Sequence, residues 1–299
     1  MRRSIVVFAG LAVTGSLALT GCAKNTSKTS SPTSTATVNA VSKDQAAADL
    51  LPAAIKSSGK LVVGINLPYA PNEYKDPSGK LVGWEVDLLN AIATKLGVTT
   101  DYRESSFDNI IPSVKGGKFN LGMSSLTDNK TREAQVDFVN YYSAGIQWAG
   151  PAGKTVDPNN ACGLKVAVQT GTTEQTEDLP AKSKACTAAG KKPITIVKID
   201  SQDAVNQAVI LGQAEALDAD SPITQYAVKQ SKGKLLLAGE IYGAAPYGFT
   251  VGKDAGTLKQ ALQKGLQSMI DDGTYKQVLD KWGVGAGAIT QATVNGAQS

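Results

Sequence analysis

Short apolar strands alternate with amphipathic helices along the middle of this 299-residue chain, and this alternation restricts the fold more than any other feature. Residues 61–65 form a short apolar run, and residues 84–96 repeat apolar side chains at helical spacing before Gly97. Alternation of this kind indicates an α/β architecture. Further strands are predicted at 99–104, 119–123, 165–169, 194–199, 214–219 and 247–251, and further helices at 108–115, 202–211, 223–230, 258–270 and 274–282.

Two segments, 144–154 and 242–248, combine glycine, proline and small residues with strand-like sequence. We interpret them as two crossings of the chain between two lobes. Residues 148–245 would then form a second lobe, inserted between residues 58–147 and 246–284 of the first. Two crossings make a hinge, which would let the lobes close around a ligand.

The N-terminus is typical of an export signal. Arg2 and Arg3 precede a short apolar run that ends at Cys22, and no stop-transfer pattern follows. A cysteine at the cleavage point resembles the bacterial lipoprotein signal, in which that thiol is lipidated; an ordinary signal peptide with a chance cysteine is the alternative. The lipoprotein interpretation makes residues 1–21 the signal peptide and anchors the protein to the outer face of the cell membrane.

The composition of both ends of the chain predicts flexible segments. Residues 22–57 are predicted to be the lipidated cysteine and a flexible tether leading into the fold, because residues 23–45 are rich in small and polar side chains. Residues 285–299 are small and polar and are predicted to be a loose tail. Losing Arg2 and Arg3 with the signal would lower the net charge from +4 to +2, which is too mild to indicate a nucleic-acid partner. No second apolar run reaches membrane-spanning length, so the lipid is the expected membrane contact.

Cys162 and Cys186 are the two remaining cysteines. An oxidising compartment favours a disulfide between them, and two buried free thiols are the alternative. The chain has no histidine to complete a ligand set, so we expect no metal site at this pair.

Residues 83–88, Gly-Trp-Glu-Val-Asp-Leu, resemble the signature of the family 3 extracellular solute-binding proteins, which are the amino-acid receptors of ABC importers. Several stretches follow this family in order and spacing: 61–87, 107–138, 163–174, 211–220 and 247–282. The resemblance implies a two-lobed fold with the ligand in the cleft, no catalysis and no cofactor, and delivery of the ligand to a membrane permease. The spacing of Cys162 and Cys186 also resembles that of actinobacterial members, and we expect a monomer.

By this resemblance, Arg132 pairs with the carboxylate of a free amino acid, and Ser125 and Thr127 donate hydrogen bonds to it. A buried carboxylate needs an arginine fork and hydroxyl donors of this kind. The alternative for Arg132 is a surface ion pair with Asp128 or Glu133.

The ligand ammonium needs a carboxylate, and the resemblance assigns this role to Asp220. Asp218 is a neighbour that could be mistaken for it, and Asp220 could instead only cap the helix that begins near residue 222. Thr172 and Thr173 lie in a turn between a strand and a helix, a place that favours anions. In the family this turn closes over the ligand carboxylate from the second lobe.

Two aromatic residues complete the expected site. Tyr69 lies where the family stacks a ring on the ligand, and Phe107 lies where the opposite wall forms, although Phe107 could serve the core alone. Trp84 is expected in the core or at the rim of the cleft. Trp148 lies on the presumed hinge, and its role is open.

Two departures from the family bear on the ligand side chain. Asn66 stands where relatives that bind cationic amino acids often carry Asp, and Asn72 replaces the usual Phe. Both favour a polar ligand such as glutamine, asparagine or glutamate, whereas Glu73 and Glu174 leave room for a cationic one.

Two other functions are weighed against a binding protein. A dehydratase of the cyclohexadienyl type would need a general acid in the cleft, and an Asp or Glu would have to serve because the chain has no histidine. No carboxylate pair beyond the binding set is apparent. A ligand-sensing module would need a separate signalling partner.

Overall fold

The computed structural model describes residues 41–298. The predicted signal peptide, Cys22 and most of the predicted tether therefore lie outside the described residues.

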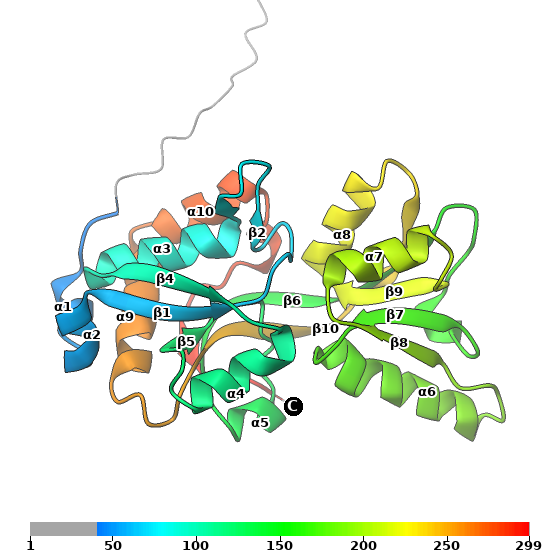
Figure 1. The fold of residues 1–299 in the computed structure, drawn as a ribbon, viewed down its shortest axis with the longest axis horizontal. Helices are drawn as coiled ribbons and strands as arrows, with labels where there is room; N and C mark the ends of the chain where they lie inside the picture. The colour runs from blue at the N-terminus through cyan, green and yellow to red at the C-terminus, as the bar shows by residue number, and fades with distance from the viewer. Residues whose placement is uncertain (1–40, 299) are drawn as a thin grey trace, which may run out of the picture. The chain divides into compact units, whose positions relative to one another are not determined.

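A nine-stranded mixed sheet forms the framework of the described residues (Figure 1). Two long antiparallel strands, β6 (Asp137–Pro151) and β10 (Leu235–Val251), pair along its centre. Parallel strands flank them at either end: β4 (Thr99–Glu104), β1 (Lys60–Ile65) and β5 (Leu121–Gly122) on the β10 side, and β9 (Ala216–Asp220), β7 (Lys165–Gln169) and β8 (Thr195–Ile199) on the β6 side. Outside this path, β11 (Thr293–Val294) pairs with β6, and β2 (Tyr74–Lys75) with β3 (Leu81–Val82).

The two central strands belong to two lobes at once. Phe138 and Tyr141 of β6 lie in the core around β1, β4 and β5, whereas Trp148 and Ala149 of the same strand lie in the core around β7 to β9. The second lobe is thus inserted between β6 and β10, as the sequence predicts. The expected crossings are mostly the middle parts of these strands rather than loops, because antiparallel pairing satisfies their backbone polar groups.

Helices cover both lobes. Lobe 1 contains α1 (Gln45–Ala48), α2 (Ala53–Ser58), α3 (Trp84–Leu96), α4 (Ile110–Lys115), α5 (Lys130–Glu133), α9 (Leu258–Asp271), α10 (Thr274–Trp282) and the 3₁₀ turns η1 (Phe107–Asn109) and η4 (Gly285–Gly287). Lobe 2 contains the 3₁₀ turn η2 (Pro158–Asn160), the π-turn η3 (Glu174–Asp178), α6 (Leu179–Ala188), α7 (Gln202–Ile210) and α8 (Ser221–Gln230). The prediction for α3 is confirmed: its apolar face is buried, Trp84 included, and Gly97 ends it in the left-handed conformation.

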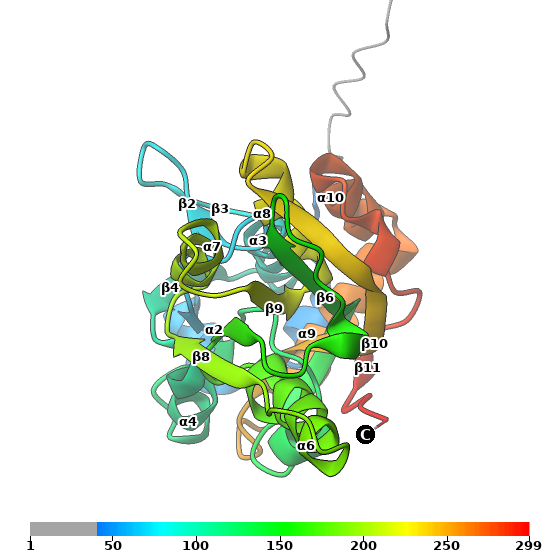
Figure 2. The same cartoon turned by 90° about the vertical axis from the view of Figure 1, so that its right-hand side faces the viewer.

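Both ends of the described chain are more ordered than the sequence suggested. Residues before 58 were predicted to be a tether, yet α1 and α2 bury Ala47 and Ile55 against the lobe 1 core. The predicted loose tail after residue 284 includes β11, which lies beside β6 (Figure 2), and buries Ala292. Small side chains mislead in both places, because they can pack closely against a sheet or helix that composition does not reveal.

Lobe 2 carries one disulfide. Cys162 and Cys186 are joined at an S–S distance of 2.02 Å, which confirms the predicted pairing. The bond links the start of the lobe to α6, and Cys186 lies in the lobe 2 core. Among residues 41–298, no helix is long and apolar enough to cross a membrane.

Candidate functional site

The predicted site residues meet where lobe 1 faces lobe 2. Five hydrogen-bonded contacts cross between the lobes there: Asn66–Gln169 (2.8 Å), Tyr69–Asp220 (2.5 Å), Thr127–Thr173 (3.4 Å), Asn129–Glu177 (2.7 Å) and the Arg132 guanidinium to the Gly171 carbonyl (3.0 Å). Gly171 has a φ of +83°, and a Cβ there would lie 2.9 Å from that of Asp108 across the cleft. The close approach of the lobes therefore requires glycine at this position.

Arg132 is held at the lobe 1 side of the cleft. The Asn129 side chain caps α5 by accepting from the Arg132 N–H at 2.8 Å, and the guanidinium donates to the Thr127 carbonyl at 2.8 Å. The guanidinium also lies 5.7 Å from the centre of the Phe107 ring. Burial lowers the pKa of Arg132, as expected for a cation removed from water.

The alternative of a surface ion pair for Arg132 does not hold in the described structure. Glu133 pairs with Lys130 at 2.9 Å, and the Asp128 carboxylate accepts from Asn140. Arg132 is 8% exposed and forms no ion pair with a residue in 41–298. Its remaining guanidinium donors suit an anion that enters the cleft.

Asp220 ends β9 and faces lobe 1. Its carboxylate accepts from the Tyr69 hydroxyl and makes no capping bond to α8, although the residue stands at the N-cap position. Burial, with the nearby Glu174 charge, raises its pKa well above the ordinary value for aspartate. Asp218 is buried as well, and Glu174, Asp178 and Lys182 are its charged neighbours in lobe 2, so both aspartates lie close to the Glu174 charge.

The turn after β7 places a third charged group at the cleft. The Thr172 hydroxyl donates to the Gln169 carbonyl at 2.9 Å, and Thr173 faces Thr127. Glu174 follows, only 2% exposed, and its Oε1 has no hydrogen-bond partner within the described chain. Burial raises the Glu174 pKa, while the Arg132 charge acts in the opposite direction.

The four aromatic side chains selected from the sequence lie in different parts of the structure. Tyr69 and Phe107 are both buried at the cleft; Phe107 also packs in a lobe 1 core cluster, so both of its expected roles are compatible with the structure. Trp148 is fully buried in the lobe 2 core, where its indole N–H donates to the Tyr242 hydroxyl at 2.9 Å. Trp84 is a core residue and donates its indole N–H to Asn72.

Ser125 and Asn72 belong to a buried network below the cleft rather than to its surface. The Ser125 hydroxyl donates to Glu85 at 2.7 Å and accepts from the Asn72 amide at 2.6 Å, and the Ser125 N–H also donates to Glu85. Both donors of Ser125 are therefore used by Glu85, contrary to the expectation that they serve a ligand. Asn72 is fully buried and adds no polarity to the pocket edge.

The same network contains residues whose position sequence patterns did not indicate. Glu85 accepts from the Tyr141 hydroxyl at 2.8 Å, and Glu73 accepts from the Ser124 hydroxyl at 2.6 Å. Glu85 looks like an ordinary first-turn acid of α3, since its partners lie 40 and 56 positions away along the chain. Local spacing carries no signal for such contacts.

The amide of Asn66 also bonds to the protein through both its nitrogen and its oxygen. It donates to the Ser105 carbonyl at 2.9 Å and accepts from the Gln169 amide of lobe 2. Asn66 therefore acts as a contact between the lobes in this structure. Among residues 41–298, no cluster of three potential metal-binding side chains occurs.

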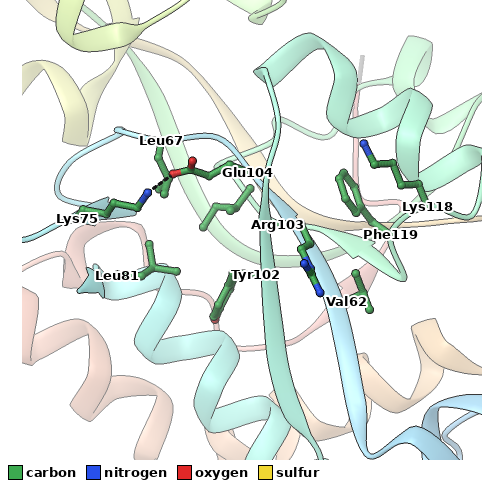
Figure 3. A pocket seen from close by; sticks show the side chains of 10 residues that line it. Val62, Leu67, Lys75, Leu81, Tyr102, Arg103, Glu104, Lys118 and Phe119 are labelled. Atoms are coloured by element: carbon green, nitrogen blue, oxygen red, sulfur yellow. Dashed lines mark hydrogen bonds and ion pairs between the residues drawn. The ribbon is translucent and has the colours of Figure 1, made fainter. Parts of the chain in front are cut away.

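A separate hollow of about 890 Å³ lies on the outside of lobe 1, near β1 and β4 (Figure 3). Lys75 reaches Glu104 across it at 2.6 Å, and both side chains are more than half exposed. None of the predicted site residues lines this hollow. A solvated ion pair of this kind indicates surface rather than a buried ligand site.

Comparison with known proteins relates this geometry to a family. The family model for bacterial extracellular solute-binding proteins, family 3, matches residues 61–285. The arginine-binding protein ArgT of Corynebacterium glutamicum is 39% identical over 248 residues, which cover 82% of this chain and 81% of that protein. These relatives are binding proteins rather than enzymes.

Solved structures agree with the sequence match. An ancestral arginine-binding protein bound to arginine superposes with a TM-score of 0.69 at 32% identity, covering 75% of this chain and 98% of its own. An ancestral arginine-binding protein bound to glutamine also superposes with a TM-score of 0.69, at 33% identity, covering 76% of this chain and 98% of its own.

Proposed function

Since this chain belongs to the bacterial extracellular solute-binding proteins of family 3, we propose that it captures a basic amino acid, with L-arginine the first candidate, between its lobes. It would deliver this ligand to the permease of an ABC importer. The observation that carries the proposal is Glu174, a buried carboxylate in the cleft with an oxygen that lacks a partner within the described residues.

Two charged side chains of the site suit the carboxylate and the ammonium that all free amino acids share. Arg132, with donors to spare, suits the ligand carboxylate; its guanidinium bonds to the Thr127 carbonyl, and the Thr127 hydroxyl meets that of Thr173. Asp220 suits the ligand ammonium, because its carboxylate is buried where the lobes meet, beside the Tyr69 and Tyr247 hydroxyls. Each lobe thus supplies one of the two opposite charges, so that closure of the cleft gains contacts that an open cleft lacks.

Glu174 then leaves one negative charge without a counterpart. Arg132 supplies one positive charge, whereas Asp220 and Glu174 supply two negative charges when ionised, and the carboxylates of Glu177 and Asp128 near Arg132 add further negative charge. Buried unpaired charges are costly, so a ligand with net charge +1 would fit this set better than a neutral one. The Tyr69 and Phe107 rings, both at the cleft, suit the flat faces of a guanidinium.

The sequence features that favoured an uncharged ligand have other uses. Asn66 is bonded to Ser105 and Gln169, and Asn72 is bonded to Ser125 and Trp84. We therefore place glutamine, asparagine and glutamate behind arginine as ligands. Glutamine remains the main comparison, because a similar ancestral protein is described with it bound.

Calorimetry with single amino acids tests the ligand class. We expect L-arginine to bind at micromolar or lower concentration and glutamine, asparagine and glutamate to bind more weakly. Tighter binding of glutamate would contradict the charge argument, and the absence of binding to any amino acid would contradict the proposed function itself.

We also propose that Cys22 is lipidated and anchors the receptor beside its permease. The support is the sequence pattern, together with a family described as extracellular. A Cys22→Ala protein should be released from the membrane fraction yet bind arginine as the unchanged protein does. Retention of Cys22→Ala protein in washed membranes would remove the lipid anchor from the account.

A further inference from the structure

Residues 292–297, which we name the C-terminal strap, lie beyond the 61–285 span shared with the family. They nonetheless run along the lobe 1 part of β6, on the edge that β9 occupies further along the same strand. Thr293 pairs with Asn140 and Val294 with Val139. The strap therefore completes an edge of the sheet next to the turn that carries Arg132.

Asn295 fixes the strap at its middle. Its side chain accepts from the Phe138 N–H at 2.8 Å and donates to Asp137 at 3.0 Å, while its backbone N–H donates to the Phe138 carbonyl. A φ of +53° turns the chain there, a conformation that asparagine tolerates better than most residues. The next two peptide N–H groups, those of Gly296 and Ala297, bond to side chains, and the Gly296 N–H donates in part to the Asn140 side-chain oxygen of β6 at 3.0 Å.

Those two N–H groups bond to both ends of the turn that carries Arg132. Gly296 donates to the Asp128 carboxylate at 2.8 Å, and Ala297 donates to the Glu133 carboxylate at 3.2 Å. Asp128 directly follows Thr127, whose carbonyl accepts from Arg132. We propose that the C-terminal strap positions Arg132 for its ligand by holding the carboxylates that begin and end its turn.

The C-terminal strap offsets the repulsion between two carboxylates in that turn. Asp128 and Glu133 lie close together, and burial together with the Glu133 charge raises the pKa of Asp128 to about 6. Two donors from one rigid segment reduce this repulsion and limit the separation of the two carboxylates. Gly296 has no room for a side chain, because a Cβ would lie 2.6 Å from the Asn140 side-chain oxygen.

The inference rests on the proposed role of Arg132, and two chain lengths test it. A variant that ends at Gln291 lacks the strap, whereas a variant that ends at Ala297 keeps it and serves as the control. We expect the shorter variant to bind L-arginine about ten-fold more weakly, within the range of coupling between groups in contact. The control should bind as the full chain does.

A double-mutant thermodynamic cycle separates an effect of the strap on the position of Arg132 from a general loss of structure. In an Arg132→Ala background, loss of the strap should weaken binding at high arginine concentrations by less than two-fold. An equal loss in both backgrounds would overturn the proposal. If the shorter variant does not fold, Ala297→Pro, which removes the N–H that bonds to Glu133 and leaves the rest of the strap sequence in place, enters the same cycle.

Hydrogen–deuterium exchange tests the strap without any ligand. Removal of residues 292–299 should speed exchange in residues 128–133, including the Arg132 N–H that bonds to Asn129. Unchanged exchange there would overturn the proposal even if arginine binds. Faster exchange in a protein that binds no amino acid would support the strap and contradict only the proposed function.

Discussion

In lobe 1, the buried polar side chains beneath the cleft bond mainly to one another, whereas in lobe 2 the carboxylates of Asp220 and Glu174 lie where the lobes meet. Ser125, Glu85 and Asn72 form a continuous network in lobe 1. Asp220 accepts one bond from Tyr69, and Glu174 retains an oxygen without a partner among the described residues. Lobe 1 is thus prepared in advance, while lobe 2 holds negative charge that a basic ligand would neutralise.

The largest expected effect comes from removing the cation of lobe 1. Arg132→Ala should weaken arginine binding by about 4 kcal/mol, because the ligand carboxylate would be buried without its partner. Arg103→Ala is a matched control, since Arg103 is exposed and pairs with Asp101. Calorimetry on both proteins measures the difference, and equal affinities would remove Arg132 from the site.

The second-largest expected effect is a loss of stability when the lobe 1 network is disrupted. Glu85→Ala should lower the free energy of unfolding by about 3 kcal/mol, because the Ser125 and Tyr141 donors would stay buried without an acceptor. Glu104→Ala removes an exposed glutamate that pairs with Lys75, and should change stability little. Urea unfolding of the two variants gives the comparison; similar values would show that the network is not a major source of stability.

The corresponding change in lobe 2 should have opposite effects on binding and stability. Asp220→Asn should weaken arginine binding by about 2 kcal/mol, because the ammonium loses a charged acceptor. The ligand-free protein should become more stable near neutral pH, since a buried carboxylate with a raised pKa is removed. Calorimetry and thermal unfolding measure the two effects, and a loss of stability would contradict the contrast between the lobes.

The pH dependence follows from the raised pKa of Asp220. A carboxyl whose pKa is higher in the folded protein stabilises the fold below its unfolded pKa and loses that contribution as pH rises toward the folded value. Ligand-free protein should therefore lose stability as pH rises above about 4, and Asp220→Asn should reduce this slope. Thermal unfolding across pH shows the slope, and an unchanged slope would show that Asp220 is not the responsible group.

Patterns between residues close together in the sequence led to correct predictions of secondary structure. The spacing of Trp84, Leu88 and Ile92 predicted α3, and the two later cysteines were paired correctly. Arg132 and Asp220 were chosen through resemblance to a family, and the structure places both at the cleft. Their contact with the ligand is part of the proposed function.

The predictions that were wrong concern residues whose partners lie far away along the chain. Ser125 was assigned to the ligand because nothing local shows that Glu85 takes both of its donors. Residues 292–297 look loose by composition, yet their order depends on the edge of β6, which lies about 150 positions earlier. Asn66 and Asn72 seemed to report on the ligand, whereas each is bonded to other parts of the protein.

Glu174 is proposed to select a ligand with a positively charged side chain, and comparison of arginine with citrulline, its neutral isostere, isolates this effect. Calorimetry should show that the unchanged protein prefers arginine to citrulline by about 2 kcal/mol, and that Glu174→Gln abolishes most of this preference. If Glu174→Gln keeps the full preference for arginine, or if the unchanged protein binds both ligands equally, the account of lobe 2 is wrong.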